Sequence, residues 1–328
     1  MTKLPTLAEI EAAAVTVYET IGGPTPAIAW PLLAKRAGCE VWVKHENHTP
    51  IGAFKVRGGL VYMDNLAKAV DRPAGVTSAT RGNHGQSIAL AARKAGLRAV
   101  IYVPEGNSVE KNAAMAAFGA ELVVHGRDFE EAHAACRQVA AEQGLHFVPS
   151  FDPLLVAGVA TYALEFFHQA PELDVVYVPV GMGSGICGMI AARDALGLKT
   201  DIVGVVADGA PAIALSFAAG HPVPTNQART FADGVACREP YAPALDSMLK
   251  GAARIVKVTD EAIADAIRAY YTDIHNLSEG AGAAPLAALL SERDKLLGKR
   301  AGVILSGGNI DQSLFAKVLS GGTPQIGD

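Results

Sequence analysis

The chain has 328 residues and a formal net charge of -5 at pH 7; half of its residues are hydrophobic and 19% are charged. Since single hydrophobic cores usually stop growing at about 250 to 300 residues, we expect two domains. The negative net charge and the scattered Lys and Arg residues argue against a nucleic-acid surface.

The amino terminus indicates no export, and we expect a cytoplasmic protein. Residues 1–20 mix Glu and Lys into a helical periodicity and contain no apolar signal core. Residues 175–192 carry no charge, but Pro179 and several glycines interrupt them, which fits a strand, a turn and a helix rather than a membrane span. The cysteines are widely spaced without a CxxC pair, and they predict neither a disulfide framework nor a zinc site.

Strands and helices alternate along most of the chain. The pattern predicts helices at residues 7–19, 31–37, from 54 or 55 to 69, 85–95, 109–118 and 129–143. It predicts strands at residues 40–44, 76–79, 98–103, 121–124, 146–148, 174–180, 202–206, 254–258 and 302–305. Such alternation is typical of parallel sheets joined by right-handed crossovers, with helices on both faces. We therefore expect two open, twisted, mostly parallel α/β layers divided near residue 150, with an irregular segment at residues 207–238.

Lys55 is the first candidate for chemistry. It lies between Phe54 and the segment Val-Arg-Gly-Gly at residues 56–59. Apolar and glycine neighbours remove water from an ammonium group and so lower its pKa. A neutral lysine amine can hold an aldehyde cofactor as a Schiff base. A surface lysine beside a glycine turn is the alternative interpretation.

The turn at residues 78–86, Ser-Ala-Thr-Arg-Gly-Asn-His-Gly-Gln, connects a predicted strand to a predicted helix. Amides at a helix start favour an anion, and Thr80 and Asn83 add side-chain donors. The turn therefore predicts a carboxylate site. A structural helix cap with glycines for tightness is the alternative.

Two further turns follow predicted strands. Glycines alternate at residues 181–185, a spacing that favours a nest of amides around a phosphate. This turn can also be interpreted as a dinucleotide fingerprint with Asp208 on the ribose, although Ile186 replaces the third glycine of that pattern. The other turn is residues 306–309, Ser-Gly-Gly-Asn, at the carboxyl end of a strand, where ligands bind in open parallel sheets. A serine hydroxyl there can meet a ring nitrogen, and a turn without a ligand is the alternative.

Taken in this order, the pieces resemble the fold-type II pyridoxal-phosphate enzymes, specifically the serine/threonine dehydratase and serine racemase group. The resemblance spans about residues 24–310 and rests on the segments 45–47, 52–58, 82–86, 181–185 and 232–234, on Glu279, and on segment 306–309. It implies a tryptophan synthase β-like fold with the cofactor between two domains. The small domain would be residues 48–150, nested within a large cofactor-binding domain of residues 1–47 and 151–328. It also implies a homodimer.

The resemblance implies that the cofactor is pyridoxal 5'-phosphate, with Lys55 as its covalent anchor and as the general base. Ser306 would bond the pyridine nitrogen and support catalysis. The other cofactor-binding residues would be Phe54 against the ring, Asn83 on the phenolic oxygen, the phosphate loop Gly181, Met182, Gly183, Ser184 and Gly185, and Glu279. The substrate-binding residues would be Thr80, Arg81, Gly82, Asn83 and His84.

The implied reaction is the α,β-elimination of a β-hydroxy amino acid to a 2-oxo acid and ammonia. Threonine, serine, phenylserine and 3-hydroxyaspartate are all candidate substrates. The alternatives are a β-replacement enzyme of the cysteine-synthase kind, an NAD-dependent oxidoreductase that uses the loop at residues 181–185, and a cofactor-binding protein without turnover.

The sequence departs from the usual dehydratase pattern at several positions. Arg81 stands where the racemases carry a serine, and a cationic guanidinium is a poor base, so racemisation is not expected. Its guanidinium can bind a second substrate carboxylate or pair with a surface acid. Val159 and Ala160 replace a common Gln-Gly pair and predict an altered pocket wall. Val206 stands where some relatives have a cation-binding acid, so we expect no required metal. The short segment after Ser306 predicts no effector domain.

Overall fold

The computed structural model describes residues 3–127 and 129–325. The α-helices of this part are α1 (Leu7–Ile21), α2 (Pro31–Ala37), α3 (Lys55–Ala67), α4 (Asn83–Lys94), α5 (Val109–Ala117), α6 (Phe129–Gln143), α7 (Pro153–Gln169), α8 (Ser184–Ala195), α9 (Ala212–Ala219), α10 (Ala242–Gly251), α11 (Asp260–Ile274), α12 (Gly280–Ser291) and α13 (Gln312–Leu319). Its strands are β1 (Ala27–Ala29), β2 (Glu40–His45), β3 (Gly75–Ala79), β4 (Arg98–Val103), β5 (Glu121–Val124), β6 (His146–Phe147), β7 (Val175–Pro179), β8 (Asp201–Ala207), β9 (Arg254–Val258) and β10 (Arg300–Leu305). Two short 3-10 helices are η1 (Asp233–Val235) and η2 (Arg293–Lys295).

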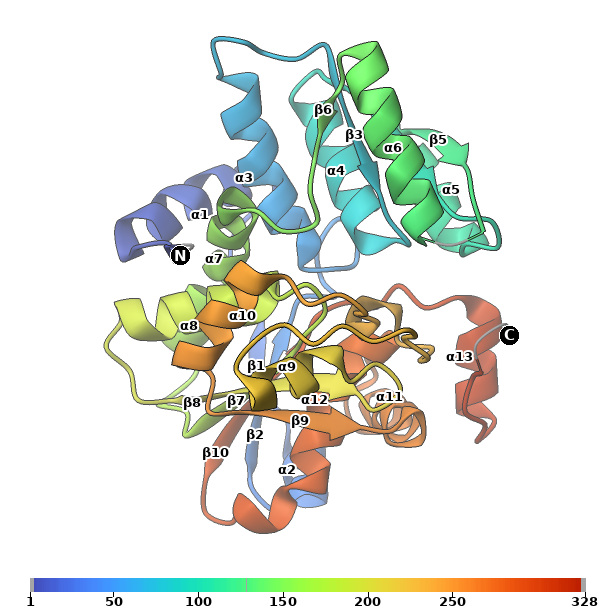
Figure 1. Ribbon diagram of the computed structural model, residues 1–328. Helices are drawn as coiled ribbons and strands as arrows, with labels where there is room; N and C mark the ends of the chain where they lie inside the picture. The colour runs from blue at the N-terminus through green and yellow to red at the C-terminus, as the bar shows by residue number, and fades with distance from the viewer. Residues whose placement is uncertain (1–2, 128, 326–328) are drawn as a thin grey trace.

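The strands form two sheets that confirm the expected α/β fold. The six-stranded sheet has the order β1-β2-β10-β7-β8-β9, and the four-stranded sheet has the order β5-β4-β3-β6. Neighbouring strands are parallel except for β1, which is antiparallel to β2. Figure 1 shows the smaller sheet with α3 to α6 in the upper part of the molecule and the larger sheet below it. The exact division at residues 47 and 150 stays a prediction.

The apolar core fills both faces of the six-stranded sheet. Tyr177 and Val303 belong to the cluster on one face. Their chain neighbours Val176, Val178 and Ile304 belong to the cluster on the other face. This alternation follows from the two-residue period of a strand, and it explains why these strands are apolar throughout.

The structure differs from the predicted elements in several places, including the helices α7 and α10 to α13, which were not predicted. Strand β1 was not predicted, because three residues in an antiparallel edge are too short to show a period. Helix α9 lies within the segment expected to be irregular. Helix α4 begins at Asn83 rather than at Gly85, so Asn83 and His84 belong to its first turn.

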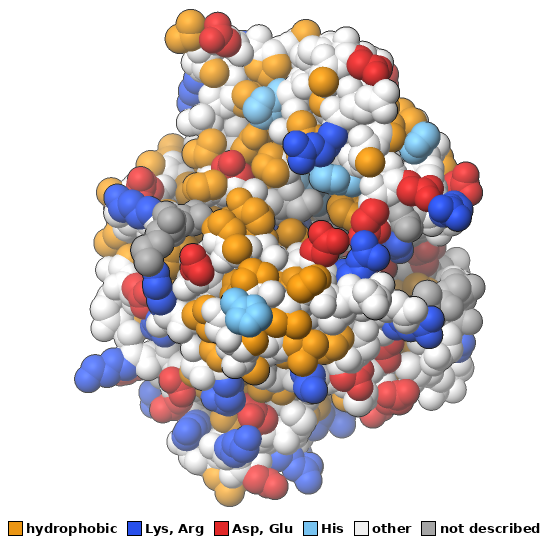
Figure 2. Space-filling view, viewed as in Figure 1, with side chains coloured by type: hydrophobic (Ala, Val, Ile, Leu, Met, Phe, Trp, Pro, Cys, Tyr) orange, Lys and Arg blue, Asp and Glu red, His pale blue; other side chains and the backbone are white. Residues whose placement is uncertain are grey.

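The side of the molecule shown in Figure 2 has no basic patch. Figure 2 shows acidic and basic side chains interspersed around this side, with hydrophobic side chains gathered near its centre. Among residues 3–127 and 129–325, every helix falls short of the length or apolarity that a bilayer crossing needs.

Helices α3 and α7 approach each other backbone to backbone through two glycines. A Cβ atom on Gly58 would lie 2.8 Å from the carbonyl oxygen of Leu155, and one on Gly158 would collide with the carbonyl oxygen of Arg57. Neither position has room for a side chain. The close approach places the side chain of Arg57 directly against α7.

A buried cluster of four charged residues joins β2, α3 and α7. Arg57 Nε lies 2.7 Å from Glu46 Oε2, and Arg57 Nη1 lies 2.5 Å from Glu165 Oε1. Lys44 Nζ lies 2.6 Å from Glu165 Oε2, and Lys44, Glu46 and Arg57 have no exposed surface. Burial opposes ionisation of Glu165, but the adjoining guanidinium and ammonium hold the pKa of its carboxyl below its ordinary value. These two cations therefore favour the ionised form of Glu165.

Replacement of Glu165 by Ala is expected to destabilise the protein by about 3 to 5 kcal/mol, because Arg57 and Lys44 would keep only one buried counter-charge. Urea unfolding followed by circular dichroism measures the change. The matched control is Glu121→Ala, which removes an exposed partner of Arg98 and should leave the unfolding midpoint unchanged. Equal effects of the two substitutions would contradict this account.

Candidate active site

Lys55 is the first residue of α3 and faces the start of α8. Its Nζ donates a hydrogen bond to Ser184 Oγ at 3.1 Å, and it lies 5.2 Å from the centre of the Phe54 ring. Burial lowers the pKa of this amine to about 8. The neutral fraction of this amine near neutral pH is thus larger than that of an ordinary lysine, in the direction that its neighbours in the sequence predicted.

The glycine loop at residues 181–185 leads from β7 into α8. Gly183 has φ 98° and is the residue that caps α8, a conformation that favours glycine. A Cβ atom on Gly181 would collide with the carbonyl oxygen of Gly234. In the described part of the chain, the amides of Ser184, Gly185 and Ile186 donate to no acceptor. Unpaired amides at the first turn of a helix, behind a loop with glycine at every second position, suit an anion such as a phosphate.

Ser306 lies beside Phe54 at the carboxyl end of β10. The amide of Phe54 donates to the carbonyl oxygen of Ser306 at 2.9 Å, and Ala53 forms an antiparallel bridge with Gly307. Ser306 is buried. The structure therefore brings the lysine, the serine and the glycine loop to one place, although they are far apart in the sequence.

The turn that precedes α4 is organised by Thr80. Its Oγ1 accepts hydrogen bonds from the amides of Gly82 at 3.0 Å and Gly85 at 3.3 Å. A hydroxyl has two acceptor sites and one hydrogen, so this hydroxyl can only donate to a further partner. Within the described residues, the amides of Asn83 and His84 likewise have no acceptor. Three donors at one turn suit a carboxylate, and the substrate site at this turn stays a prediction.

His84 and Arg81 flank this turn with different surroundings. His84 is buried, and its Nε2 has no hydrogen-bond partner among the described residues. Burial and the positive charge of Lys55 lower the pKa of His84 to about 3, so its ring is neutral. Arg81 is exposed and forms no hydrogen bond or ion pair within residues 3–127 and 129–325. Its side chain thus makes no polar contact with the other predicted site residues in the described part of the chain.

Asn83 and Glu279 are joined directly. Asn83 Nδ2 donates to Glu279 Oε1 at 2.7 Å. Burial raises the pKa of Glu279 to about 7, although the charge of Lys111 and the hydrogen bond from Asn83 oppose the rise. The Glu279 carboxyl lies over Gly307, where a Cβ atom would come within 2.6 Å of Oε1.

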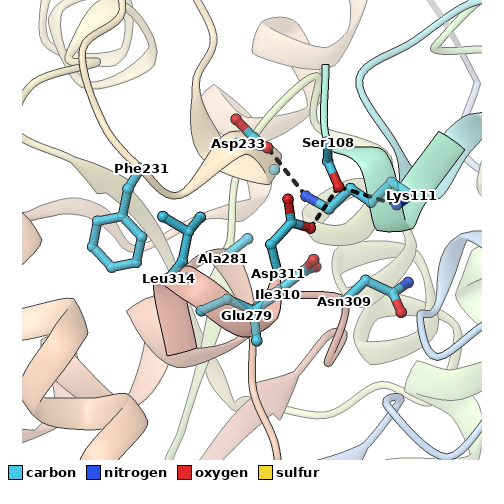
Figure 3. A pocket seen from close by; sticks show the side chains of 12 residues that line it. Ser108, Lys111, Phe231, Asp233, Glu279, Ala281, Asn309, Ile310, Asp311 and Leu314 are labelled. Atoms are coloured by element: carbon cyan, nitrogen blue, oxygen red, sulfur yellow. Dashed lines mark hydrogen bonds and ion pairs between the residues drawn. The ribbon is translucent and has the colours of Figure 1, made fainter. Parts of the chain in front are cut away.

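Sequence reasoning gave no role to several residues that surround Glu279. Lys111 Nζ lies 3.1 Å from Asp233 Oδ2, and Ser108 Oγ donates to Asp311 Oδ1 at 2.5 Å. Figure 3 shows these pairs around a cavity of about 40 Å³ next to Glu279. Asp233 lies within residues 232–234, which belong to the family resemblance, and its charge could have marked it as a candidate site residue. No pattern in the sequence pointed to Lys111 or Ser108.

Val159 and Ala160 do not lie at the glycine loop. Both are buried within the packing of α7 on α8, where a Cβ atom on Gly188 would lie 3.0 Å from the amide nitrogen of Ala160. Gly188 lies one turn inside α8. The predicted effect of these two residues on a pocket wall stays a prediction.

Comparison with known proteins places the site in a family. Residues 18–307 match the family model described as pyridoxal-phosphate dependent enzyme. An L-threonine ammonia-lyase of Thermotoga maritima is 32% identical over 323 residues, which cover 98% of this chain and 80% of the relative. An L-threo-3-hydroxyaspartate ammonia-lyase of Saccharomyces cerevisiae is 30% identical, with 97% of each chain covered. The processed form of threonine deaminase isoform 2 from Solanum lycopersicum superposes with a TM-score of 0.88 at 29% identity, covering 98% of this chain and 90% of that structure.

The chain belongs to the family of pyridoxal-phosphate-dependent enzymes. The expected cofactor, the fold type and the class of lyase are thereby confirmed, and the NAD-dependent alternative is wrong. The site also fits this cofactor on its own geometry. The close approach of backbone at Gly181 suits the phosphate, and the half-buried amine of Lys55, whose pKa is lowered, suits the aldehyde.

The amine of Lys55 is expected to become reactive at a lower pH than ordinary lysines in the cofactor-free protein. Because only the neutral amine reacts, labelling by an acylating reagent should rise through a midpoint near pH 8. Lys68 is the control, since its hydrogen bond to Asp64 raises its pKa. Mass spectrometry of the labelled peptides across pH 6 to 11 measures both midpoints. An unperturbed lysine, whose pKa is about 10.4, titrates within this range. Coincident midpoints would contradict the burial of Lys55.

Proposed function

We propose that this protein is an ammonia-lyase that converts a β-hydroxy amino acid of the threonine or serine type into a 2-oxo acid and ammonia. One arrangement carries the proposal: a half-buried lysine amine of lowered pKa lies between a loop that suits a phosphate and a turn whose three donors suit a carboxylate. The relatives named as threonine and hydroxyaspartate ammonia-lyases support the same reaction.

The residues divide the work between binding and proton transfer. Pyridoxal phosphate supplies an aldehyde that condenses with amines and a ring that withdraws electrons from the substrate Cα. The hydroxyl of Thr80 and the amides of Asn83 and His84 hold the substrate carboxylate. The Lys55 amine, which is neutral above about pH 8, accepts the Cα proton as the β-hydroxyl leaves.

Three further residues hold the cofactor in this proposal. Ser306 offers a neutral hydroxyl to the ring nitrogen, Phe54 supplies an apolar face, and Asn83 bonds the phenolic oxygen. A hydroxyl cannot stabilise a protonated ring nitrogen as a carboxylate does, and this favours elimination over transamination. The phosphate lies on the amides at the start of α8.

Replacement of Lys55 by Ala is expected to abolish the release of ammonia and 2-oxo acid, because the anchor and the base are lost together. Ser306→Ala should lower kcat/KM roughly tenfold, the usual effect of one lost hydrogen bond to a ligand. A panel of threonine, serine, phenylserine and 3-hydroxyaspartate, read by 2-oxo acid formation, measures both. The control is Lys68→Ala, on the exposed end of α3. Full activity of Lys55→Ala would overturn the proposal.

A substrate with a second carboxylate is the second candidate, because Arg81 presents an unpaired guanidinium next to the turn. A guanidinium binds a carboxylate with two parallel hydrogen bonds. The yeast relative that is named for 3-hydroxyaspartate supports this candidate.

The substitution Arg81→Ser is expected to lower the preference for 3-hydroxyaspartate over threonine by roughly tenfold, as one charge-assisted contact is lost. The ratio of the two kcat/KM values measures the preference. Arg93→Ser removes an exposed arginine from the far end of α4 and serves as the control. An unchanged ratio in Arg81→Ser would exclude the role of this residue.

We also propose a cytoplasmic homodimer whose small domain, residues 48–150, is nested within the large one, and which needs no metal. All four cysteines are buried and unpaired, which fits a reducing compartment. The proposal of a homodimer rests on the resemblance to the family. Sedimentation equilibrium decides the number of subunits, and activity after chelation decides the need for a metal.

A further inference from the structure

The carboxamide of Asn83 is held from two sides by residues of other segments. Its Nδ2 donates to Glu279 Oε1 at 2.7 Å, and its Oδ1 accepts from Asn309 Nδ2 at 2.7 Å. Asn309 lies in the segment between β10 and α13, and Glu279 precedes α12. Thus Asn83, the first residue of α4, is hydrogen-bonded to two residues from the part of the chain that contains β10, α12 and α13.

The chemistry of the partners fixes which way the Asn83 carboxamide faces. Asn309 Nδ2 also donates to the carbonyl oxygen of Ile51 at 2.8 Å, and a carbonyl oxygen can only accept. The NH₂ group of Asn309 must therefore face Ile51 and Asn83, rather than its oxygen. It follows that the oxygen of Asn83 faces Asn309 and the NH₂ group of Asn83 faces Glu279.

This assignment leaves one N–H of Asn83 unused. An asparagine NH₂ group has two hydrogens, and Glu279 accepts one of them. The described chain offers no acceptor for the other. A flipped carboxamide would present its oxygen in place of this hydrogen, and it would then repel an anionic ligand atom.

We propose that Asn309 is a positioning residue that, together with Glu279, holds the free N–H of Asn83 toward the phenolic oxygen of pyridoxal phosphate. The inference deepens the proposed function and rests on it, because Asn83 is placed on that oxygen there. Asn309 does not touch the cofactor in this account; it acts by fixing the orientation of Asn83.

The consequence is spectroscopic as well as catalytic. A hydrogen bond to the phenolic oxygen stabilises the form of the bound cofactor in which this oxygen is negatively charged, the form that absorbs in the visible. Without the donor, the neutral form that absorbs in the near ultraviolet gains population. The ratio of the two bands therefore reports the orientation of Asn83 without any turnover.

The test compares the absorption spectra of the purified holoenzyme and of two variants, Asn309→Asp and Asn309→Ala. The aspartate keeps the size of the side chain but replaces the two donors by acceptors, and the alanine removes the side chain. Each variant is expected to lower the ratio of visible to near-ultraviolet absorbance roughly tenfold, as expected for the loss of one hydrogen bond to a charged group. Cofactor affinity, measured by fluorescence titration, should fall in parallel.

The matched control is Asn107→Ala. Asn107 Nδ2 donates to Asn112 Oδ1 at 2.7 Å, the same kind of amide pair before α5. The control should keep the ratio of the wild-type protein.

The outcomes separate the inference from the proposed function. A wild-type protein that gains no visible band with the cofactor would overturn the proposed function itself. A coloured wild-type protein with an unchanged band ratio in both Asn309 variants would overturn only the role of Asn309. An equal loss in Asn107→Ala would overturn it as well, since the effect would then come from general destabilisation.

Discussion

The structure depends most on the burial of Arg57 between the carboxylates of Glu46 and Glu165. Burial of charge is costly unless every charge has a partner in good geometry, so these side chains allow little displacement of the elements that carry them. Arg57 lies only two residues beyond Lys55 on α3. The cluster therefore fixes the position of the reactive lysine against β2 and α7, while its own charges remain outside the chemistry.

The site is built from backbone groups and side chains at the ends of helices and strands. The first turn of a helix has amides without partners, and parallel strands end at the same edge of a sheet. Helix α4 follows strand β3 of the small sheet, and α8 follows strand β7 of the large sheet. Ser306 follows β10, a central strand of the large sheet. A single ligand can thus be held by both sheets at once. The hydrogen bond from Lys55 to Ser184 joins the two halves of this site.

Much of this arrangement could be predicted from the sequence, and the rest depends on contacts between distant segments. The apolar strands, the lysine among apolar neighbours and the glycine loop have local causes, and the structure contains them. Strand β1 was missed because an edge strand of three residues has no period. The contacts of Asn83 with Glu279 and Asn309 join residues 196 and 226 positions apart, and no spacing predicts which side chains meet over such separations.

If Arg81 binds a second substrate carboxylate as proposed, the selectivity of the protein depends on a side chain with no part in its architecture. Its backbone belongs to a turn that Thr80 holds rigid, while its side chain stabilises nothing else in the described structure. Evolution could exchange this side chain without loss of folding or of the bound vitamin. With that proposed role, a lineage could change between neutral and acidic substrates through substitutions at this single position.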